Sequence, residues 1–270
     1  MKIGIVGEGV VGSEMRRLFS DHDPLIYDPD RRYCCEKEDL EESDAVFICV
    51  PTDKLPDGSC DISIVEKTVE WLSKLDVGII IIRSTVQPGT TEYLKEEFNV
   101  SIVMVPEYLG ETVNHPMSNS KERTFLVIGG TPEDRNKALD IFKLVYSSNI
   151  KVGLCSAMEA EMTKYMENAY LATKVVFCHE FYRICKAFDI DYNIVREMWL
   201  LDPRITPSHT WADGTGYKSK CFDKDIPAII KASEEMGYQP TFLENMVEIN
   251  EKNLLLRQKT AKSGGIERKT

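Results

Sequence analysis

The first half of the chain alternates short apolar runs with segments of helical spacing. The pattern predicts strands at residues 2–6, 25–27, 45–50, 78–82, 102–105, 125–128 and 151–154, and helices at residues 13–20, 62–75, 90–98 and 132–145. This regular alternation predicts an α/β fold, a Rossmann-type doubly wound parallel sheet with its ligand at the carboxyl ends of the strands.

The pattern changes after residue 156. Residues 157–188 keep helical periodicity without a glycine or a proline, and further helices are expected at residues 192–201, 226–236 and 242–256. We therefore expect a first domain at residues 1–155 and a smaller all-α domain with a long central helix at residues 156–260. The tail, residues 261–270, is expected to be disordered.

A glycine-rich turn follows the first predicted strand and opens the first predicted helix. The sequence there is GEGVVG over residues 7–12, a GxGxxG pattern in the setting that binds the diphosphate of a dinucleotide. Asp28 ends the next strand, 21 residues after Gly7 (28 − 7), where a carboxylate binds the ribose hydroxyls and disfavours a 2′-phosphate. The first domain is thus predicted to bind NAD through Gly7, Gly9, Val10, Val11, Gly12 and Asp28.

Polar or proline-containing turns follow three later strands. They are residues 51–53, 84–89 and 106–111, and all should lie at the ligand-binding edge of the sheet. Ordinary turn chemistry is the alternative explanation for their composition.

One cysteine lies in a long irregular segment of the second half. Cys221 is preceded by the glycines of residues 214–216 and has Lys218, Lys220 and Lys224 close in sequence. Nearby cations stabilise a thiolate, so Cys221 is a candidate nucleophile. The alternative is a small buried side chain, like other structural cysteines.

Two polar residues share one face of the long predicted helix. Lys164 and Asn168 are spaced i, i+4, so an ammonium and an amide could act on one oxygen atom. A solvated helix face is the alternative interpretation.

The composition of the chain disfavours several kinds of partner and binding site. The chain has 270 residues and a net charge of −11, which disfavours nucleic acid as a partner. No apolar run approaches the length of a membrane span, and the eight cysteines lack metal-site spacing. We therefore expect a cytoplasmic protein with reduced thiols, no metal and no membrane role.

Taken together, the motifs resemble those of the UDP-glucose/GDP-mannose dehydrogenase family, in order and over nearly the whole chain. The matching pieces are residues 7–12, Val50-Pro51-Thr52 with residues 57–58, Ser84-Thr85-Val86 with residues 88–91, Pro106-Glu107-Tyr108-Leu109 with Glu111, residues 164–168, Arg204-Ile205 and residues 221–225. The resemblance implies NAD-dependent oxidation of a UDP-glucose-like nucleotide sugar to the carboxylate, through a cysteine thiohemiacetal and thioester. It also implies a homodimer formed through the helical domain.

The resemblance assigns roles by position. The nucleophile falls on Cys221, the oxyanion-stabilising pair on Lys164 and Asn168, and the carboxylate that assists water attack on Glu107, while Thr85 and Asp225 complete the catalytic set. Val50, Pro51, Thr52, Ser84 and Thr85 fall on the cofactor side, and Tyr108, Leu109, Glu111, Arg204 and Lys224 on the substrate side. Lys218 and Ser219 stand where the family tends to have two glycines, and we expect a short form without the family's C-terminal nucleotide-binding domain.

Two other functions remain open at this point. A two-electron dehydrogenase of the β-hydroxyacid type also places a Lys and an Asn one turn apart on a central helix, and it would not need Cys221. A catalytically silent NAD-binding or partner-binding module would need neither the thiol nor the oxyanion pair.

Overall fold

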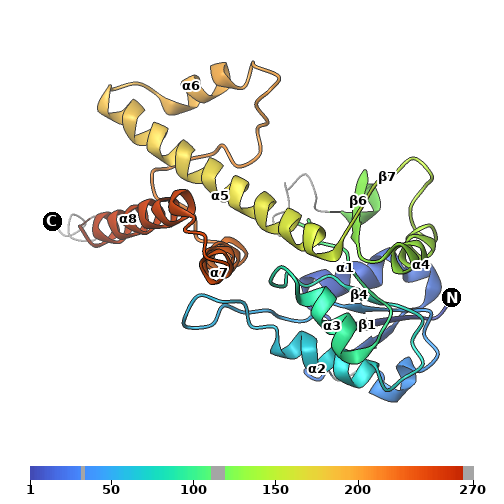
Figure 1. Ribbon diagram of the computed structural model, residues 1–270. Helices are drawn as coiled ribbons and strands as arrows, with labels where there is room; N and C mark the ends of the chain where they lie inside the picture. Colours follow the sequence, from blue (N-terminus) through green and yellow to red (C-terminus); the bar gives the residue numbers. More distant parts are fainter. Residues whose placement is uncertain (32–33, 111–118, 264–270) are drawn as a thin grey trace. The chain divides into compact units, whose positions relative to one another are not determined.

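The protein divides into two compact units, Met1–Lys164 and Tyr165–Thr270, in the order of elements shown in Figure 1. This computed structural model describes residues 1–31, 34–110 and 119–263, with side chains as far as Leu255. The first unit contains the whole sheet, and the second unit is built from helices.

The first unit is built on one seven-stranded sheet in the order β2-β1-β3-β4-β5-β6-β7. The strands are β1 (Ile3–Val6), β2 (Leu25–Tyr27), β3 (Ala45–Ile48), β4 (Ile80–Ile82), β5 (Ile102–Met104), β6 (Phe125–Gly129) and β7 (Lys151–Cys155). Because β1 pairs with β2 on one side and β3 on the other, the strand order reverses beside β1. That reversal places the ligand edge at the carboxyl ends of β1 and β3, as expected for a doubly wound sheet.

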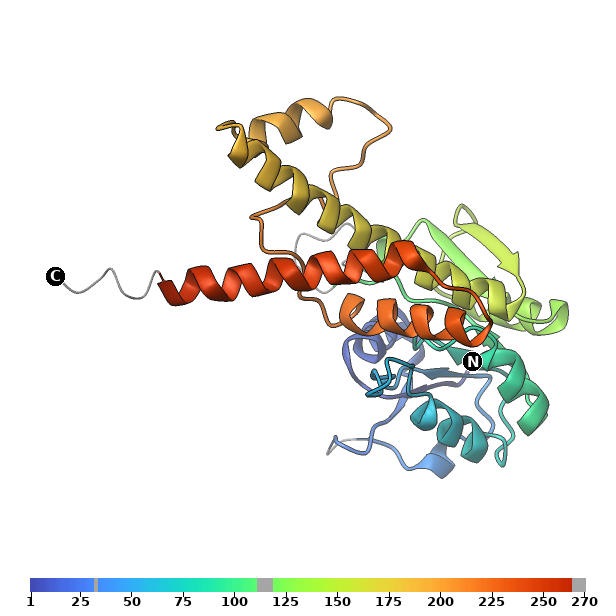
Figure 2. The ribbon, with the colours of Figure 1, turned by 60° about the vertical axis from the view of Figure 1, so that its left-hand side comes forward.

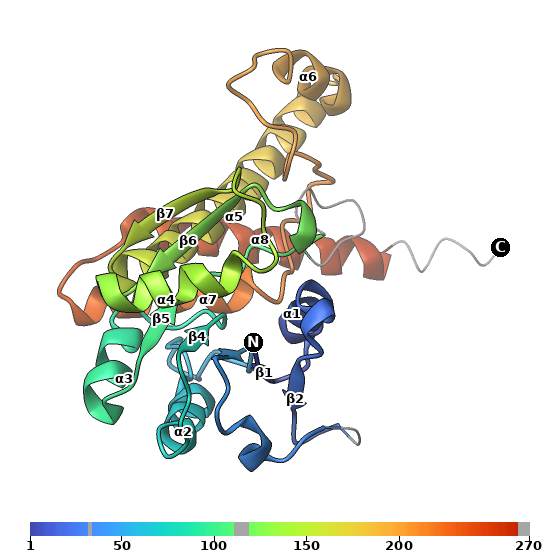
Figure 3. The same ribbon diagram turned by 90° about the vertical axis from the view of Figure 1, so that its right-hand side faces the viewer.

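One strand pair departs from the expected parallel arrangement. Strands β1 to β5 are parallel, but β6 runs antiparallel to β5, with Met104 opposite Gly129. In the described part of the connection the chain forms only the short helix η3 (Ser120–Glu122), and a strand that returns without a crossover helix pairs antiparallel. Helix α4 (Pro132–Phe142) then connects β6 to β7 as a parallel pair, side by side in Figure 3.

Helices cover both faces of the sheet. Helix α1 (Val10–Leu18) and α4 contribute Met15 and Ile141 to the core on one face. Helices α2 (Ser63–Leu72) and α3 (Thr90–Phe98) contribute Val69 and Leu94 to the core on the other face. Two further short 3-10 helices are η1 (Ser20–His22) and η2 (Lys37–Leu40).

The first turns of the long helix α5 (Ala157–Ala187) and the start of α3 cap each other. The carboxylate of Glu161, fully buried, accepts hydrogen bonds from the Gly89 and Thr91 N–H groups at 2.6 and 2.8 Å, at the N-terminus of α3. In return, Glu92 of α3 accepts the Met158 N–H at 3.2 Å. Burial raises the pKa of Glu161 to about 7, against the opposing effect of these hydrogen bonds. At both helix N-termini, carboxylates thus accept hydrogen bonds from backbone N–H groups that have no partner within the helix.

The second unit packs three more helices against the rest of α5. They are α6 (Tyr192–Trp199), α7 (Phe222–Glu235) and α8 (Thr241–Ser263). Phe177 of α5 contacts Trp199 at the end of α6, with ring centroids 6.0 Å apart, and α6 lies beside the C-terminal end of α5 in Figure 1. Helices α7 and α8 are neighbours, as Figure 2 shows, and share a core with α5 through Val176, Ile226 and Met246.

Two helix boundaries in this unit differ from the sequence prediction by more than two residues. Helix α7 begins at Phe222, not at residue 226, because Asp223 and Asp225 in its first turn favour a helix N-terminus there. Helix α8 continues to Ser263, so residues 261–263 are helical where a disordered tail was expected. The rest of that tail, residues 264–270, lies outside the described residues.

The eight cysteines are all free thiols. Across residues 1–31, 34–110 and 119–263, no helix combines the length and the apolar character that crossing a bilayer requires. The same residues contain no group of three or more His, Cys, Asp or Glu side chains arranged to hold a metal ion.

Candidate active site

The turn after β1 is shaped for close approach of a ligand. Gly7 has φ +88°, and a Cβ at Gly12 would lie 1.8 Å from the Gly7 carbonyl oxygen, so neither position admits a side chain. A Cβ at Gly9 would meet nothing within 4 Å, which means that the space in front of the turn is open. Gly9 caps α1 without a side-chain hydrogen bond, and the first turn of α1 has no acidic residue. These features fit an anionic diphosphate at the helix N-terminus.

Asp28 is connected to the same turn. Its carboxylate accepts the Glu8 N–H at 2.6 Å and the Asp30 N–H at 3.0 Å. A carboxylate has about four lone-pair sites, so capacity remains for ribose hydroxyls. Val10 is exposed, and Val11 packs partly on the core behind the turn. This part of the site therefore has the composition that NAD requires.

The turns after β3 and β4 are joined by hydroxyl groups. The Thr52 hydroxyl donates to the Thr85 carbonyl at 2.7 Å, and the Ser84 hydroxyl donates to the Val50 carbonyl at 2.7 Å. Pro51 lies between Val50 and Thr52 and is exposed. The structure therefore brings together the five residues that the sequence placed on the cofactor side of these two turns.

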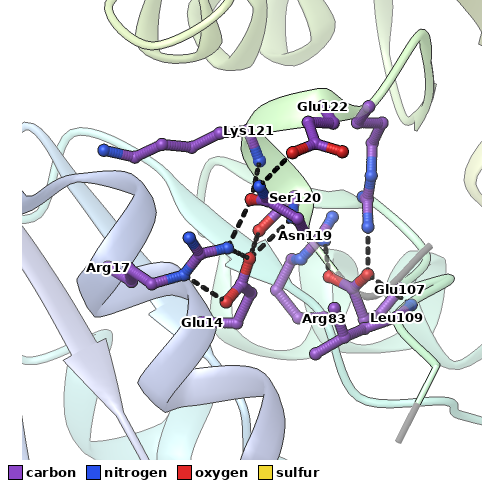
Figure 4. Close-up of polar contacts among 10 residues, drawn as sticks. Glu14, Arg17, Arg83, Glu107, Leu109, Asn119, Ser120, Lys121 and Glu122 are labelled. Atoms are coloured by element: carbon purple, nitrogen blue, oxygen red, sulfur yellow. Dashed lines mark hydrogen bonds and ion pairs between the residues drawn. The ribbon is translucent and has the colours of Figure 1, made fainter. Parts of the chain in front are cut away.

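Glu107, in the turn after β5, is held by four donors. Arg83 and Arg123 each form an ion pair with it, and the Tyr108 and Leu109 N–H groups donate to it at 2.7 and 2.8 Å. Figure 4 shows Arg83 and Leu109 beside Glu107. Burial would raise the pKa of Glu107, but the two arginines outweigh burial and lower it to about 2. Glu107 is therefore a buried carboxylate that stays ionised at neutral pH, and a weak proton acceptor.

Sequence reasoning missed the two arginines. Both guanidinium groups are buried, and Arg83 also donates to the Val105 carbonyl at 2.7 Å. The available signal was the position of Arg83, directly after the apolar strand β4, because a charge placed beside a buried strand needs a partner.

A second buried carboxylate near Glu107 was also missed. Glu14 of α1 accepts the Ser120 N–H at 2.7 Å, the Ser120 hydroxyl and the Arg17 guanidinium (Figure 4). Burial opposes ionisation, but the hydrogen bonds from Arg17 and Ser120 dominate and lower the pKa of Glu14. Because Ser120 begins η3, Glu14 fixes that turn to the helix that follows the glycine-rich loop.

Lys164 lies near Glu107 and Tyr108. Its ammonium stands 4.9 Å from the centre of the Tyr108 ring, at the distance of a cation–π contact, and the Tyr108 ring packs on Phe125. The first unit thus brings together Lys164 and Tyr108 from the predicted site. Glu111, the other carboxylate expected here, lies outside the described residues.

The second unit gathers four predicted residues at the start of α7. Cys221 is the N-cap residue of α7 and is half-buried. Asp225, one turn later, accepts a hydrogen bond from the Asn168 amide at 2.6 Å and an ion pair from Lys224 at 2.5 Å. The N-terminus of a helix favours negative charge, and the carboxylates of Asp223 and Asp225 also lie in this first turn.

Arg204 has other contacts. Its guanidinium pairs with Asp202 at 2.5 Å, and its side chain is 86% exposed. It lines a pocket of about 220 Å³ with Trp199 of α6, four residues of α5 that include Tyr170, and its neighbours Ile205 and Thr206. Its expected role in substrate binding remains a prediction.

Comparisons with known proteins agree with this geometry. Two sequence profiles match: the UDP-glucose/GDP-mannose dehydrogenase family, NAD binding domain, over residues 31–150, and the central domain of the same family over residues 158–252. The chain is similar to UDP-glucose 6-dehydrogenase AglM of Haloferax volcanii, with 28% identity over 93% of this chain and 70% of the relative. It is also similar to putative UDP-glucose 6-dehydrogenase YtcA of Bacillus subtilis, with 31% identity over 84% of this chain.

Solved structures give the same result. A UDP-glucose dehydrogenase from Pyrobaculum islandicum has a TM-score of 0.81 and 26% identity, covering 93% of this chain and 68% of that one. The chain spans only 55% of the length of the Bacillus subtilis relative. The first unit is an NAD-binding domain, and the chain belongs to the UDP-glucose/GDP-mannose dehydrogenase family.

Proposed function

We propose that this protein oxidises the primary alcohol of a UDP-glucose-like nucleotide sugar to the carboxylate, with NAD as oxidant and Cys221 as nucleophile. The observation that carries the proposal is the cluster at the start of α7, where Cys221 is the N-cap residue and Asp225, one turn later, bonds to Asn168 and Lys224. A nucleotide sugar as substrate is supported by the two relatives described above, which are named as a UDP-glucose 6-dehydrogenase and a putative one.

The reaction removes four electrons. One alcohol, one water and two NAD⁺ give one carboxylate, two NADH and three protons. Bound NAD accepts one hydride in each of the two oxidations. The aldehyde formed in between must be retained, and the Cys221 thiolate does this by forming a carbon–sulfur bond, giving a thiohemiacetal. Its oxidation gives a thioester, and water breaks the carbon–sulfur bond, releasing the carboxylate and restoring the thiolate.

The surrounding polar groups have separate tasks in this proposal. Lys164 and Asn168 stabilise the oxyanion that recurs along the path. Asp225 orients the Asn168 amide and the Lys224 ammonium through the bonds described above. Glu107 assists the attack of water; since it is a weak proton acceptor, its expected contribution is to orient the water. Thr85 lines the reacting end of the site.

Counting the NADH formed per sugar tests this function. With a panel of UDP- and GDP-sugars and excess NAD, we expect two NADH for each sugar consumed, read by absorbance, and an acid product identified by mass spectrometry. One NADH per sugar, with no dependence on Cys221, would indicate a two-electron dehydrogenase. NAD binding without turnover of any sugar would indicate a silent binding module.

We also infer that the protein forms a homodimer through its helical unit. A stripe of large apolar side chains is exposed along one face of α5, from Met166 and Tyr170 to Phe181 and Phe188, and Met198 of α6 is exposed as well. The side chains of Met166 and Phe188 are both 75% exposed. Such exposure is unusual for large apolar side chains, because their transfer out of water is favourable. A second copy of the same stripe would cover it.

Sedimentation tests the homodimer. Wild-type protein should sediment as two chains, twice 30.7 kDa, and a Met166→Glu/Phe181→Glu double variant should sediment as one chain, because four buried charges would face each other. Glu234→Lys, which changes a surface charge on α7, should leave the mass unchanged. Wild-type protein that is monomeric at about 10 μM would contradict the inference.

A further inference from the structure

The segment that leads to Cys221 is held by side chains from two helices. We call residues 213–217 the Gly216 segment. The Gly216 N–H donates to Nδ1 of His179 on α5 at 3.0 Å. The Tyr217 N–H donates to Oδ1 of Asn250 on α8 at 2.8 Å, and the Asn250 amide donates back to the Tyr217 carbonyl at 3.1 Å. Three hydrogen bonds therefore locate this backbone four to five residues before Cys221.

The backbone of the segment lies close to those helices. Gly216 has φ +78°, and a Cβ there would lie 2.5 Å from Oδ1 of Asn250. Gly214 has φ +81°, and a Cβ there would lie 2.9 Å from the Tyr182 ring. Glycine is required at both positions, so the segment has one close-packed path against α5 and α8.

His179 is the titratable member of this arrangement. It is 4% exposed, and its Nδ1 can accept the Gly216 N–H only when that nitrogen carries no proton. A protonated ring would place an N–H against the Gly216 N–H, and its charge would be attracted to Oδ1 of Asp213, 3.6 Å away. On the same helix, Arg183 bonds the Gly214 carbonyl, and α8 presents the neutral amides of Asn250 and Asn253.

We propose that His179 is a positioning residue for Cys221: by accepting the Gly216 N–H it fixes the segment that places Cys221 at the N-terminus of α7, and its protonation releases that segment. The proposal rests on the proposed function only in taking Cys221 as the nucleophile.

The direction of the pH effect follows from the surroundings. Burial lowers the pKa of His179 below its usual 6.5, Asp213 opposes this, and Arg183 adds to it. Above pH 6.5 the ring is unprotonated and the hydrogen bond is fully present. As the pH falls below 6.5 and through the lowered pKa, the proton is taken up and the contribution of the bond is lost.

Amide hydrogen exchange of residues 214–220, corrected for the intrinsic rate, measures the release directly. In the wild type we expect protection to fall by about fivefold to tenfold between about pH 7.5 and pH 5, the equivalent of one hydrogen bond. His179→Asn keeps an acceptor that does not titrate, so its protection should not depend on pH. His179→Leu should be less protected throughout, and His22→Asn, a change in the first unit, should match the wild type.

Alkylation of Cys221 by iodoacetamide at pH 8, followed on its own peptide, tests the positioning role. We expect the rate in His179→Leu to differ from the wild type by about threefold or more, with His179→Asn restoring it to within about twofold. An unchanged rate in His179→Leu, or a His179→Asn variant that loses protection at low pH as the wild type does, would overturn the proposal. Neither measurement requires turnover, so a failure here is distinct from a failure of the proposed oxidation.

Discussion

Replacing Cys221 with serine should abolish formation of the acid product. Serine keeps the size of the side chain, but its hydroxyl ionises far less readily, so the aldehyde is no longer captured as a covalent adduct. Removing the nucleophile of an enzyme of this kind lowers kcat by at least about 10³-fold. The measurement is the rate of acid formation with a sugar that the wild type oxidises.

A second thiol provides the control. Cys155 on β7 is also partly exposed but lies in the first unit, so Cys155→Ser should keep acid formation within about twofold of the wild type. Both variants should bind NAD as the wild type does, because the predicted coenzyme residues lie around β1 and β2 and in the turns after β3 and β4. Acid formation at the wild-type rate in Cys221→Ser would refute the role of the thiol.

Replacing Glu107 with glutamine should destabilise the protein by about 3–5 kcal/mol. The amide removes the negative charge that compensates two buried guanidinium groups, Arg83 and Arg123, while leaving the size of the side chain unchanged. Urea denaturation, followed by circular dichroism, measures the free energy of unfolding.

An exposed ion pair gives the matched comparison. Glu70 pairs with Lys74 on α2 at 3.0 Å, with both side chains largely exposed, so Glu70→Gln should cost less than about 1 kcal/mol. The pKa of Glu107 is lowered from 4.5 to about 2, so its contribution is complete above pH 4.5 and is lost as the pH falls toward 2. If Glu107→Gln lowered the free energy of unfolding by as little as Glu70→Gln, the two buried arginines would not require the charge of Glu107.

The glycine-rich turn and Asp28 could be predicted from the sequence because their chemistry is local. Gly7 and Gly12 are five residues apart and meet within one turn, and the distance from Gly7 to Asp28 is set by one strand-helix-strand unit. The helical pattern predicted the end of α5 to within one residue. A run of 31 residues without a glycine or a proline offers no point at which the helix would stop earlier.

The polar contacts around Glu107 could not be predicted in the same way. Arg83 is 24 residues from Glu107, and Glu14 is 106 residues from Ser120, so their pairing depends on the strand order. The antiparallel β6 was missed for a related reason, because a short continuous apolar run does not reveal the direction of its strand. The start of α7 was misplaced because Pro227, a common first-turn residue, lies five residues inside the helix.

The mutual capping of α3 and α5 has a consequence for how the chain folds. Ser156 caps the Glu159 N–H of α5 locally, but the Gly89 and Thr91 N–H groups of α3 and the Met158 N–H of α5 are bonded to carboxylates 66 to 72 residues away. Closing so long a loop costs conformational entropy, and the hydrogen bonds that offset this cost form only when both ends are in place. The contacts that join the two helix starts should therefore form together, in one cooperative step.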